Sequence, residues 1–333
     1  YGSGPIRQPR LQPTYRADQF TDSIGLAYGY HDLDSDLQLD LGIRHYRSAL
    51  WDTDKGREHV PELVDILVKA WEEHGRRPMV LLDSLRDTPG QTIDMLRLYP
   101  PGLIELVEGG NEVNNKFPPQ VLNTRYGGKT DEAGGAAFMA DLAPLLDADP
   151  TLRDLPVVAF TAIFSDYQLA KPHDAFDLGN IHSYQGYGVP SSSLEMNVTR
   201  FNNILPVGGT VRPIIPTECG YNVEEDVTNQ TGISGNVAAQ AKNIPMLLAE
   251  YFRHGFPRTY LFNLRNVDGY GLLESDGETK RPSWYAVQSL MKTVADATWN
   301  PVTKRWESGD GFEPTALLFD MSGAPPSVHT LVL

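Results

Sequence analysis

The sequence contains very little cysteine, because Cys219 is the only one among 333 residues. An intramolecular disulfide is therefore excluded, and the fold has to rely on a hydrophobic core. An apolar content of 41% can supply one in a chain of this length. Cys219 has no apparent catalytic base beside it, and a free cysteine usually behaves as a small buried hydrophobic residue. We therefore do not interpret it as a nucleophile.

Positive charge is also scarce, since 28 Lys and Arg residues face 43 Asp and Glu residues and leave a formal net charge of -15. Phosphate backbones are bound by clustered cations, so no nucleic-acid partner is expected. No apolar run approaches the roughly 20 residues that a membrane-spanning helix needs, so no membrane partner is expected either. The acidic composition is typical of a soluble surface, and we expect a monomer.

The spacings that mark cofactor sites are missing as well. His31, His45 and His182 occur without a His-Glu-x-x-His or paired-cysteine pattern, so no metal is expected. There is no Walker loop. Gly109-Gly110 leads into Asn111-Glu112 instead of opening a helix, as a dinucleotide fingerprint would. We therefore expect an activity that needs no cofactor.

The sequence does contain short apolar segments that alternate with amphipathic ones. The apolar segments have the length and composition of buried strands, and Pro61 and Gly75 are typical of the first turn and the end of a helix. Eight strands separated mostly by helices predict an α/β fold, a (β/α)8 TIM barrel. The strands are expected at Ser23–His31, Gly42–Arg47, Pro78–Asp83, Leu103–Glu112, Leu155–Ala162, Asp177–Tyr184, Arg212–Glu218 and Thr259–Leu264. The helices are expected at Leu37–Leu41, Pro61–Gly75, Gln91–Leu98, Glu132–Leu146, Val237–His254 and Pro282–Val294.

The C-terminal segment departs from this pattern, because Thr315–Asp320 and Val328–Leu333 are apolar stretches with no helix between them. We expect a catalytic barrel over residues 1–300 and a small β-strand appendage over 301–333, resembling the start of a truncated β-sandwich. The final apolar strand is expected either to be cut short or to pair with the N-terminal lead. A first residue other than methionine fits either removal of a signal segment or a sequence that simply starts at this position, and we expect a secreted protein.

Two of the strands end in a glutamate beside glycine. Gly109-Gly110-Asn111-Glu112 closes the fourth strand, and Glu218 closes the seventh before Gly220. The C-terminal strand ends of a barrel share one rim, so distant residues meet there. Two carboxyl groups about 5 Å apart are the apparatus for cleaving a glycosidic bond with retention. We interpret Glu112 and Glu218 as this catalytic pair, although either one taken alone could be a solvated surface charge.

Polar side chains at neighbouring strand ends are expected to support the pair. Arg47 ends the second strand, where it would keep Glu218 ionised or form a surface ion pair. Asn111 would bond a sugar hydroxyl or simply favour the turn. His182 and Tyr184 share one face of the sixth strand, and the phenol would donate to the nucleophile or pack in the core.

Aromatic residues follow several strand ends, and their faces suit the apolar faces of sugar rings, although buried aromatics also simply pack. His31 lies among them at the end of the first strand. The loops 114–129 and 187–201 are long enough to shape a cleft. Stacking on sugar is expected from members of this group: Tyr28, Tyr30, Trp51, Tyr187 and Tyr221.

In this order and spacing the residues resemble clan A glycoside hydrolases, a retaining (β/α)8 group that includes many cellulase-like enzymes. The resemblance rests on Asn111-Glu112, Glu218, Arg47 and His182-Ser183-Tyr184. It also rests on the stretches Asp22–Leu26, Leu41–Arg47, Glu108–Glu112 and Arg258–Leu261, and it covers residues 19–294. It implies that Glu112 is the general acid/base and Glu218 the nucleophile, supported by Arg47, Asn111, His182 and Tyr184.

One departure from the family concerns the end of the eighth strand, where the family often has a tryptophan under the sugar. Here Phe262, Asn263 or Arg265 must fill that space. A polar or cationic floor would suit a substituted or acidic sugar. The sequence therefore predicts a retaining O-glycoside hydrolase acting on a β-linked poly- or oligosaccharide by double displacement. Two alternatives stay open: a carbohydrate-binding barrel without turnover, and a metal-dependent hydrolase or lyase on the same fold.

Overall fold

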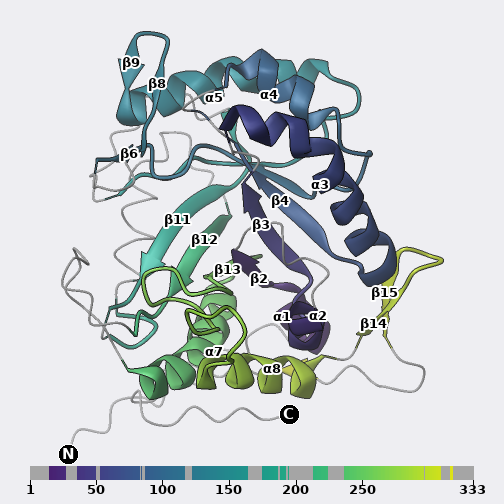
Figure 1. Ribbon diagram of the computed structural model, residues 1–333, viewed down its shortest axis with the longest axis vertical. Coiled ribbons are helices and arrows are strands. Elements are labelled where there is room, and N and C mark those ends of the chain that lie inside the picture. The colour runs from purple at the N-terminus through teal and green to yellow at the C-terminus, as the bar shows by residue number, and fades with distance from the viewer. Residues whose placement is uncertain are drawn as a thin grey trace, which may run out of the picture.

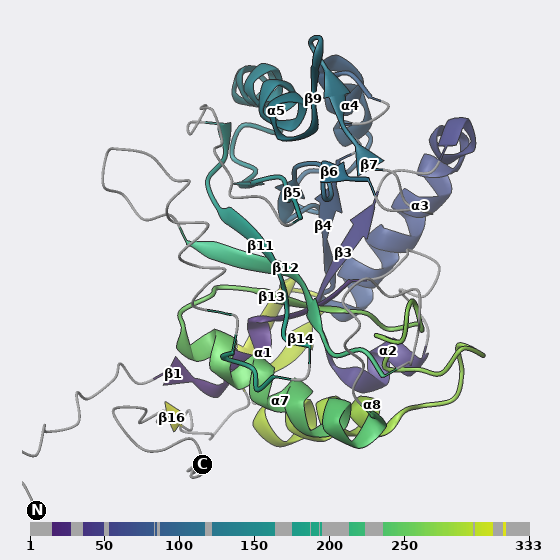
Figure 2. The ribbon, with the colours of Figure 1, turned by 90° about the vertical axis from the view of Figure 1, so that its left-hand side faces the viewer.

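A computed structural model gives the fold. It describes residues 15–27, 36–49, 53–82, 84, 87–116, 122–163, 175–186, 188–192, 194, 213–223, 236–295, 297–308 and 316–317. Its centre is an 8-stranded sheet in the order β10-β5-β4-β3-β2-β13-β12-β11, and every neighbouring pair is parallel. A parallel bridge between Val158 and Leu178 joins the two outer strands, so the barrel is nearly closed. The (β/α)8 TIM barrel predicted from the sequence is confirmed (Figures 1 and 2).

The strands and helices lie close to the predicted segments. The strands are β2 (Ile24–Ala27), β3 (His45–Ala49), β4 (Arg77–Leu81), β5 (Leu106–Glu108), β10 (Val157–Val158), β11 (Gly179–Tyr184), β12 (Ile214–Gly220) and β13 (Thr259–Phe262). The helices are α1 (Ala17–Asp22), α2 (Asp36–Leu41), α3 (Thr53–His74), α4 (Pro89–Leu96), α5 (Asp131–Ala148), α7 (Val237–Arg253) and α8 (Pro282–Val294). They surround the sheet in Figure 1, with α4 and α5 at the top and α7 and α8 at the bottom.

One predicted helix start is wrong. We expected Pro61 in the first turn, but α3 begins at Thr53 and contains Pro61. A proline removes only one backbone donor, and residues 53–60 include the helix formers Lys55, Arg57 and Glu58, so the helix continues through it.

The barrel interior changes from apolar to polar along the strands. Its lower layer consists of buried apolar residues, Met79, Leu106, Val158, Ile215 and Tyr260. Gly25 makes room for this layer, because a Cβ on it would lie 2.5 Å from the Tyr260 ring. Side chains alternate along a strand, so the same faces of β5 and β12 next present Glu108 and Thr217, which are also buried. The apolar layer therefore supports a polar layer under the C-terminal rim.

Short hairpins decorate the barrel. In the predicted loop 114–129, β6 (Asn114–Asn115) pairs with β7 (Leu122–Asn123), and β8 (Arg125–Tyr126) pairs with β9 (Lys129–Thr130). A further hairpin, β14 (Ala297–Asn300) and β15 (Arg305–Ser308), crosses residue 300, where we predicted a domain boundary. That boundary stays a prediction.

Beyond β15, the C-terminal appendage is described at one strand. β16 (Ala316–Leu317) pairs antiparallel with β1 (Tyr15–Arg16) in the N-terminal lead. The last predicted strand, 328–333, lies outside the described residues. Among the helices that the structure describes, none has the length and apolar character needed to cross a membrane.

Candidate active site

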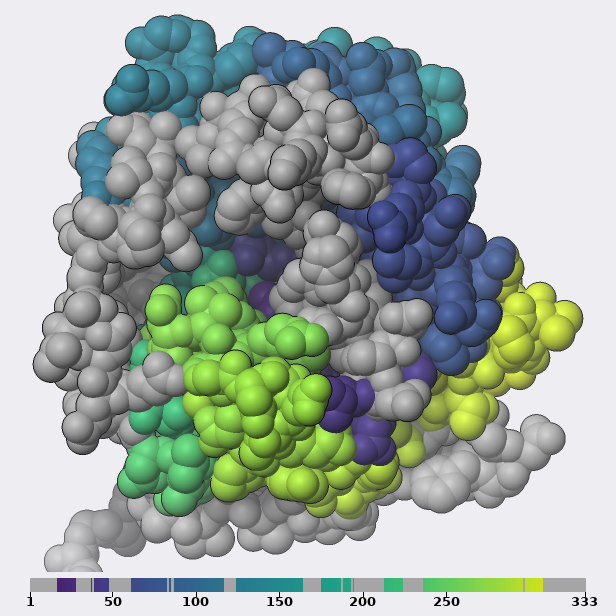
Figure 3. Space-filling model, in the orientation of Figure 1, coloured from purple at the N-terminus to yellow at the C-terminus, as the bar shows by residue number. Residues whose placement is uncertain are grey.

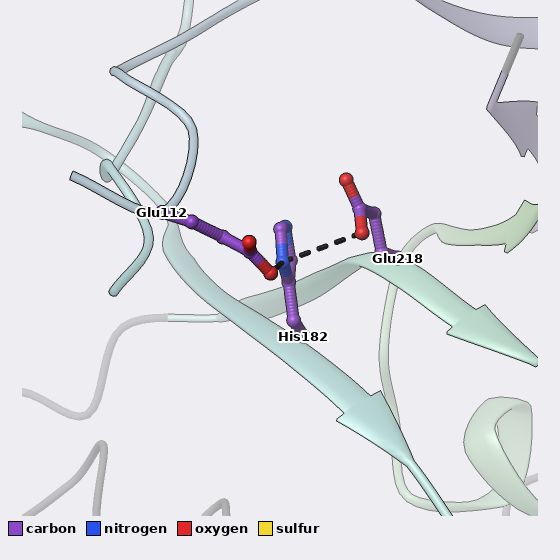
Figure 4. Close-up of side chains that lie close together, drawn as sticks. All are labelled: Glu112, His182 and Glu218. Atoms are coloured by element: carbon purple, nitrogen blue, oxygen red, sulfur yellow. Dashed lines mark hydrogen bonds and ion pairs between the residues drawn. The ribbon is translucent and has the colours of Figure 1, made fainter. Parts of the chain in front are cut away.

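The two glutamates predicted from the sequence lie together at the C-terminal end of the barrel. Glu218 is on β12, and Glu112 follows β5 after Gly109, Gly110 and Asn111. One carboxylate oxygen of each, together with Nδ1 of His182, lies within 4.8 Å of the others (Figure 4). The side chain of Glu112 is 15% exposed, whereas Glu218 is a buried residue with 9% of its side chain exposed. Figure 3 shows a hollow near the centre of this face, with N-terminal strand atoms in purple at its floor.

Donors hold both oxygens of Glu218. Arg47 donates from Nη1 to Oε1 at 2.6 Å, and the Tyr184 hydroxyl donates to Oε2 at 2.7 Å. Burial raises the pKa of Tyr184 well above its usual value, and the charge of Glu218 adds to this rise. Tyr184 therefore stays a protonated donor, and the carboxylate keeps a fixed orientation.

Glu112 is held by different partners. Its Oε1 lies 2.9 Å from Nδ1 of His182, and its Oε2 accepts a hydrogen bond from Nδ2 of Asn115 at 2.8 Å. Its backbone N–H donates to Oγ1 of Thr161 at 2.9 Å, and its φ of 40° lies in the left-handed region, which non-glycine residues seldom adopt. Such backbone strain is concentrated at functional sites, so the chain presents this side chain at an energetic cost.

The protonation states of Glu112 and His182 are linked. Burial tends to raise the pKa of Glu112, but the hydrogen bond and charge of His182, with Asn115 and Arg47, outweigh burial and lower it. Burial tends to lower the pKa of His182, but Glu218 and Glu112 outweigh burial and raise it. Between the ordinary pKa values of the two groups, 4.5 and 6.5, these shifts favour ionised Glu112 and protonated His182.

Arg47 connects Glu218 with two further residues. Its Nε and Nη2 donate to the two oxygens of Glu108 at 2.5 and 3.0 Å, and Nη2 also donates to Oδ1 of Asn111 at 2.6 Å. Burial opposes its charge, but Glu108 and Glu218 outweigh burial and raise the pKa of Arg47 further. Because Oδ1 of Asn111 accepts from Arg47, the amide nitrogen is the end of Asn111 that can donate to a ligand.

The sequence analysis missed Glu108, a carboxyl group with 0% exposure inside β5. Besides the bonds from Arg47 it accepts a hydrogen bond from Nδ2 of Asn180 at 2.8 Å, and Oγ1 of Thr217 lies 2.9 Å away. A signal for it was available, since a charged residue in an apolar strand needs buried partners. Glu108 was quoted in the family motif without a role of its own.

The end of the eighth strand is lined by aromatic rings. Phe262 lies 6.3 Å from Tyr184 and 5.9 Å from Tyr270 between ring centroids, and Tyr184 lies 4.9 Å from Tyr270. Phe262 faces the barrel interior, because it lies two residues beyond the inward-facing Tyr260. Tyr270 was not predicted, because it comes from the loop between β13 and α8 and nothing in its local sequence indicates the site.

The other two candidates for that space belong to the loop that follows β13. Asn263 is 6% exposed, and its backbone carbonyl accepts a hydrogen bond from the Leu272 N–H at 3.0 Å. Arg265 is exposed, and its guanidinium lies against Gly277. Their predicted contacts with substrate stay predictions.

The remaining predicted ligand-binding residues have different outcomes. Tyr30, His31 and Trp51 lie outside the described residues, as do Tyr28 and Tyr187. For Tyr221 the alternative of simple packing is confirmed, because it is 3% exposed and its hydroxyl donates to the carbonyl of Gly188 at 3.1 Å. It follows β12 directly and packs into the core beneath the neighbouring loop.

A metal ion is poorly suited to this cluster, although Glu112, His182 and Glu218 are close enough to share one. Both oxygens of Glu218 already face hydrogens of Arg47 and Tyr184, and Nδ1 of His182 faces a carboxylate oxygen of Glu112. A bound cation would have to displace those donors while lying close to the fixed charge of Arg47.

No protein-family model matches this sequence, and no curated protein matches it. Solved structures do resemble it in three dimensions. A GH128 (subgroup I) endo-β-1,3-glucanase from Amycolatopsis mediterranei in complex with laminarihexaose has a TM-score of 0.53 at 16% identity, with 80% of this chain and 99% of that chain covered. The barrel is one that glycoside hydrolases use.

Two further structures extend the comparison. A GH128 (subgroup II) endo-β-1,3-glucanase from Sorangium cellulosum has a TM-score of 0.51 at 20% identity over 80% of this chain and 98% of that chain. A β-glucuronidase from an uncultured Clostridium sp. has a TM-score of 0.55 at 12% identity over 81% of this chain. The chain spans only 50% of the glucuronidase. At these identities the likeness shows the fold.

Proposed function

We propose that the protein is a retaining O-glycoside hydrolase of the clan A type. The observation that supports this most directly is the pair Glu112 and Glu218, with carboxylate oxygens within 4.8 Å of one another at the rim. Retaining glycosidases separate their two carboxyl groups by about 5–5.5 Å, whereas inverting enzymes leave room for a water molecule between them. The spacing therefore favours attack by one carboxylate over activation of water by both.

In this mechanism Glu218 attacks the anomeric carbon and forms a glycosyl ester, while Glu112 gives its proton to the leaving oxygen. Glu112 then takes a proton from water, the water oxygen bonds to the anomeric carbon, and the ester bond to Glu218 breaks. Arg47 and Tyr184 hold Glu218 in position for the attack, through bonds of 2.6 and 2.7 Å. Two inversions at one carbon give net retention.

The acid step requires a proton on Glu112, and the shifted pKa values favour keeping this proton on His182 before the reaction. The two groups share a hydrogen bond of 2.9 Å, so the proton can move from Nδ1 to the carboxylate when the substrate displaces water. After the second step, Glu112 holds the proton taken from water and returns it to His182. The proton count is therefore the same at the start and end of each turnover.

For the substrate we propose a β-1,3-linked glucan first. The support is the two GH128 endo-β-1,3-glucanases, which align with this chain over 99% and 98% of their own length. A β-linked glucuronide is the second candidate, since one structural neighbour is a β-glucuronidase. Laminari-oligosaccharides and aryl β-glucuronides, assayed side by side with product sizing, distinguish the two and also separate endo from exo cleavage.

The decisive test is to trap the intermediate. A 2-fluoro glycosyl fluoride of the accepted sugar is expected to label Glu218 alone, and proton NMR of the first product is expected to show a retained anomer. Glu218→Ala should abolish turnover. Glu112→Ala should slow natural glycosides far more than aryl glycosides with acidic leaving groups, because those leave without a proton. Labelling of another residue, or an inverted product, would refute the mechanism.

Both alternatives from the sequence predict different results. A binding barrel without turnover would bind oligosaccharides and cleave no member of a glycan panel. A metal-dependent hydrolase would lose activity with a chelator and regain it with a divalent cation. Export from the cell and a monomeric state belong to the same proposal, and fractionation of the native culture and light scattering test them.

A further inference from the structure

Glu108 occupies an unusual place beneath the site. Its side chain is fully buried, so it cannot touch a substrate. A buried carboxylate is costly unless its oxygens are matched by donors. Here Nε and Nη2 of Arg47 and Nδ2 of Asn180 donate to it, and Oγ1 of Thr217 shares its one hydrogen between Glu108 at 2.9 Å and Oδ1 of Asn180 at 2.7 Å. These partners come from three other strands, β3, β11 and β12. Besides the partners, β11 carries His182 and β12 carries Glu218.

Arg47 depends on this carboxylate for its orientation. Nε and Nη2 form a two-bond fork with Glu108, whereas Nη1 makes a single bond to Glu218 and Nη2 a single bond to Asn111. Two parallel bonds fix the plane of a guanidinium, and a single bond leaves it free to turn. The direction from which Arg47 meets Glu218 is therefore set from below, by Glu108.

We infer that Glu108 is a positioning residue for the nucleophile, acting through Arg47 on the orientation of Glu218. The inference rests on the proposed glycosidase function. It assigns to Glu108 an effect on the chemical step and none on substrate affinity. Glu108, Glu112 and Glu218 all belong to the site, but Glu108 is fully buried and does not touch the substrate.

Glu108→Gln isolates this role because it preserves the size of the side chain. A Gln amide offers one acceptor oxygen, and its NH2 group would face a donor whichever way it turned. The fork with Arg47 is therefore lost. A displacement of about 1 Å at a reacting group can cost about 10²-fold in rate. We expect E108Q to lower kcat, and the maximal rate of labelling by the 2-fluoro reagent, by about 10²-fold. KM and the reagent's KI should stay unchanged.

Glu105→Gln is a matched control. Glu105 immediately precedes the same strand, its side chain is only 7% exposed, and it pairs with Arg258 at the opposite end of the barrel. Both variants should lower the unfolding temperature, but only E108Q should slow labelling. Asn180→Ala removes one donor to Glu108 and no hydrogen bond to Arg47 or Glu218. It should slow labelling several-fold, and it provides the test if E108Q does not fold.

The outcomes are distinct. Slow labelling in E108Q and Asn180→Ala, with unchanged KI and a normal E105Q, supports the inference. If wild type is labelled at Glu218, and E108Q and Asn180→Ala are labelled at the wild-type rate, Glu108 is only structural and the inference is overturned. A raised KI with an unchanged labelling rate also overturns it. A wild-type protein that is neither active nor labelled overturns the proposed function, and the inference with it.

Discussion

An ionic cluster at the N-terminal end of the barrel should make stability depend on pH. Glu105 accepts a hydrogen bond from Nη1 of Arg258 at 2.9 Å and lies 2.8 Å from Nδ1 of His45. His45 in turn lies 2.9 Å from Asp22 through Nε2. The cluster pins the starts of strands whose other ends carry the site, because His45 and Arg47 share β3.

The size of the effect follows from the pKa of Glu105. Burial alone would raise this pKa, but the charges of Arg258 and His45 outweigh burial and lower it from 4.5 to about 2. A depressed carboxyl pKa stabilises the folded state fully above the unfolded pKa. That stability is lost as the pH falls through the folded value. A pKa shift of this size contributes about 3 kcal/mol to the unfolding free energy at neutral pH.

Glu105→Gln tests this reasoning. The variant leaves Arg258 and His45 without their carboxylate, so we expect its unfolding free energy at pH 7 to fall by about 3 kcal/mol. Between about pH 5 and 3 the wild type should lose stability more steeply than E105Q. Urea unfolding at several pH values measures both quantities. Glu73→Gln, at a side chain 54% exposed, is the control and should follow the wild-type curve. Parallel pH curves for E105Q and wild type would refute the linkage.

Three further predictions concern the site. Tyr184→Phe removes the 2.7 Å hydrogen bond to Glu218. We expect kcat/KM to fall by about 10- to 100-fold, since a hydrogen bond to a charged group is worth about 1.5–3 kcal/mol. Steady-state kinetics at pH 6 measures the fall, and a fall of less than about twofold would contradict the prediction. His182→Asn keeps a donor near Glu112 but cannot store a proton. A group with a raised pKa loses its proton as the pH rises, so the alkaline limb of the rate profile should move to lower pH, and an unmoved limb would exclude His182 as the proton store. The ring of Tyr270 lies beside Tyr184, where it could contact a sugar. If it does, Tyr270→Ala should raise KM by about two- to tenfold with little change in kcat, because a ring contact is worth about 0.5–1.5 kcal/mol. Tyr270→Phe keeps the ring and should match wild type. Equal KM values for Tyr270→Ala and wild type would exclude the ring as a sugar contact.

Much of the fold could be predicted from the sequence, because strand and helix signals are local. Each of the eight strands overlaps its predicted segment, and Glu112 and Glu218 were found because an apolar run, a glycine and a glutamate occur together twice. Barrel closure then places all strand ends on one rim. The start of α3 was wrong because Pro61 was given more weight than the helix formers before it.

The rest of the site depends on pairings between distant strands. Glu108 and Thr217 are 109 residues apart in sequence, and Glu108 and Arg47 are 61 apart. Nothing local to any of them specifies the partner. Tyr270 joins the site only because its loop folds back over β13, where the N–H groups of Leu272 and Leu273 bond to the carbonyls of Asn263 and Leu264. Such contacts form only when the barrel closes, so they could not be predicted from the sequence before the arrangement of the strands was known.

One network of buried charge lies on each side of the apolar layer in the barrel. Glu105 with Arg258 lies below Met79, Leu106 and Tyr260, and Glu108 with Arg47 lies above them. Both networks contain a carboxylate paired with an arginine, so both should affect stability when broken. Only the upper one touches the carboxylate that we propose as the nucleophile. Comparing E105Q with E108Q therefore separates what the barrel needs in order to fold from what the site needs in order to react. Equal effects of the two on the labelling rate would mean that the layer does not insulate them.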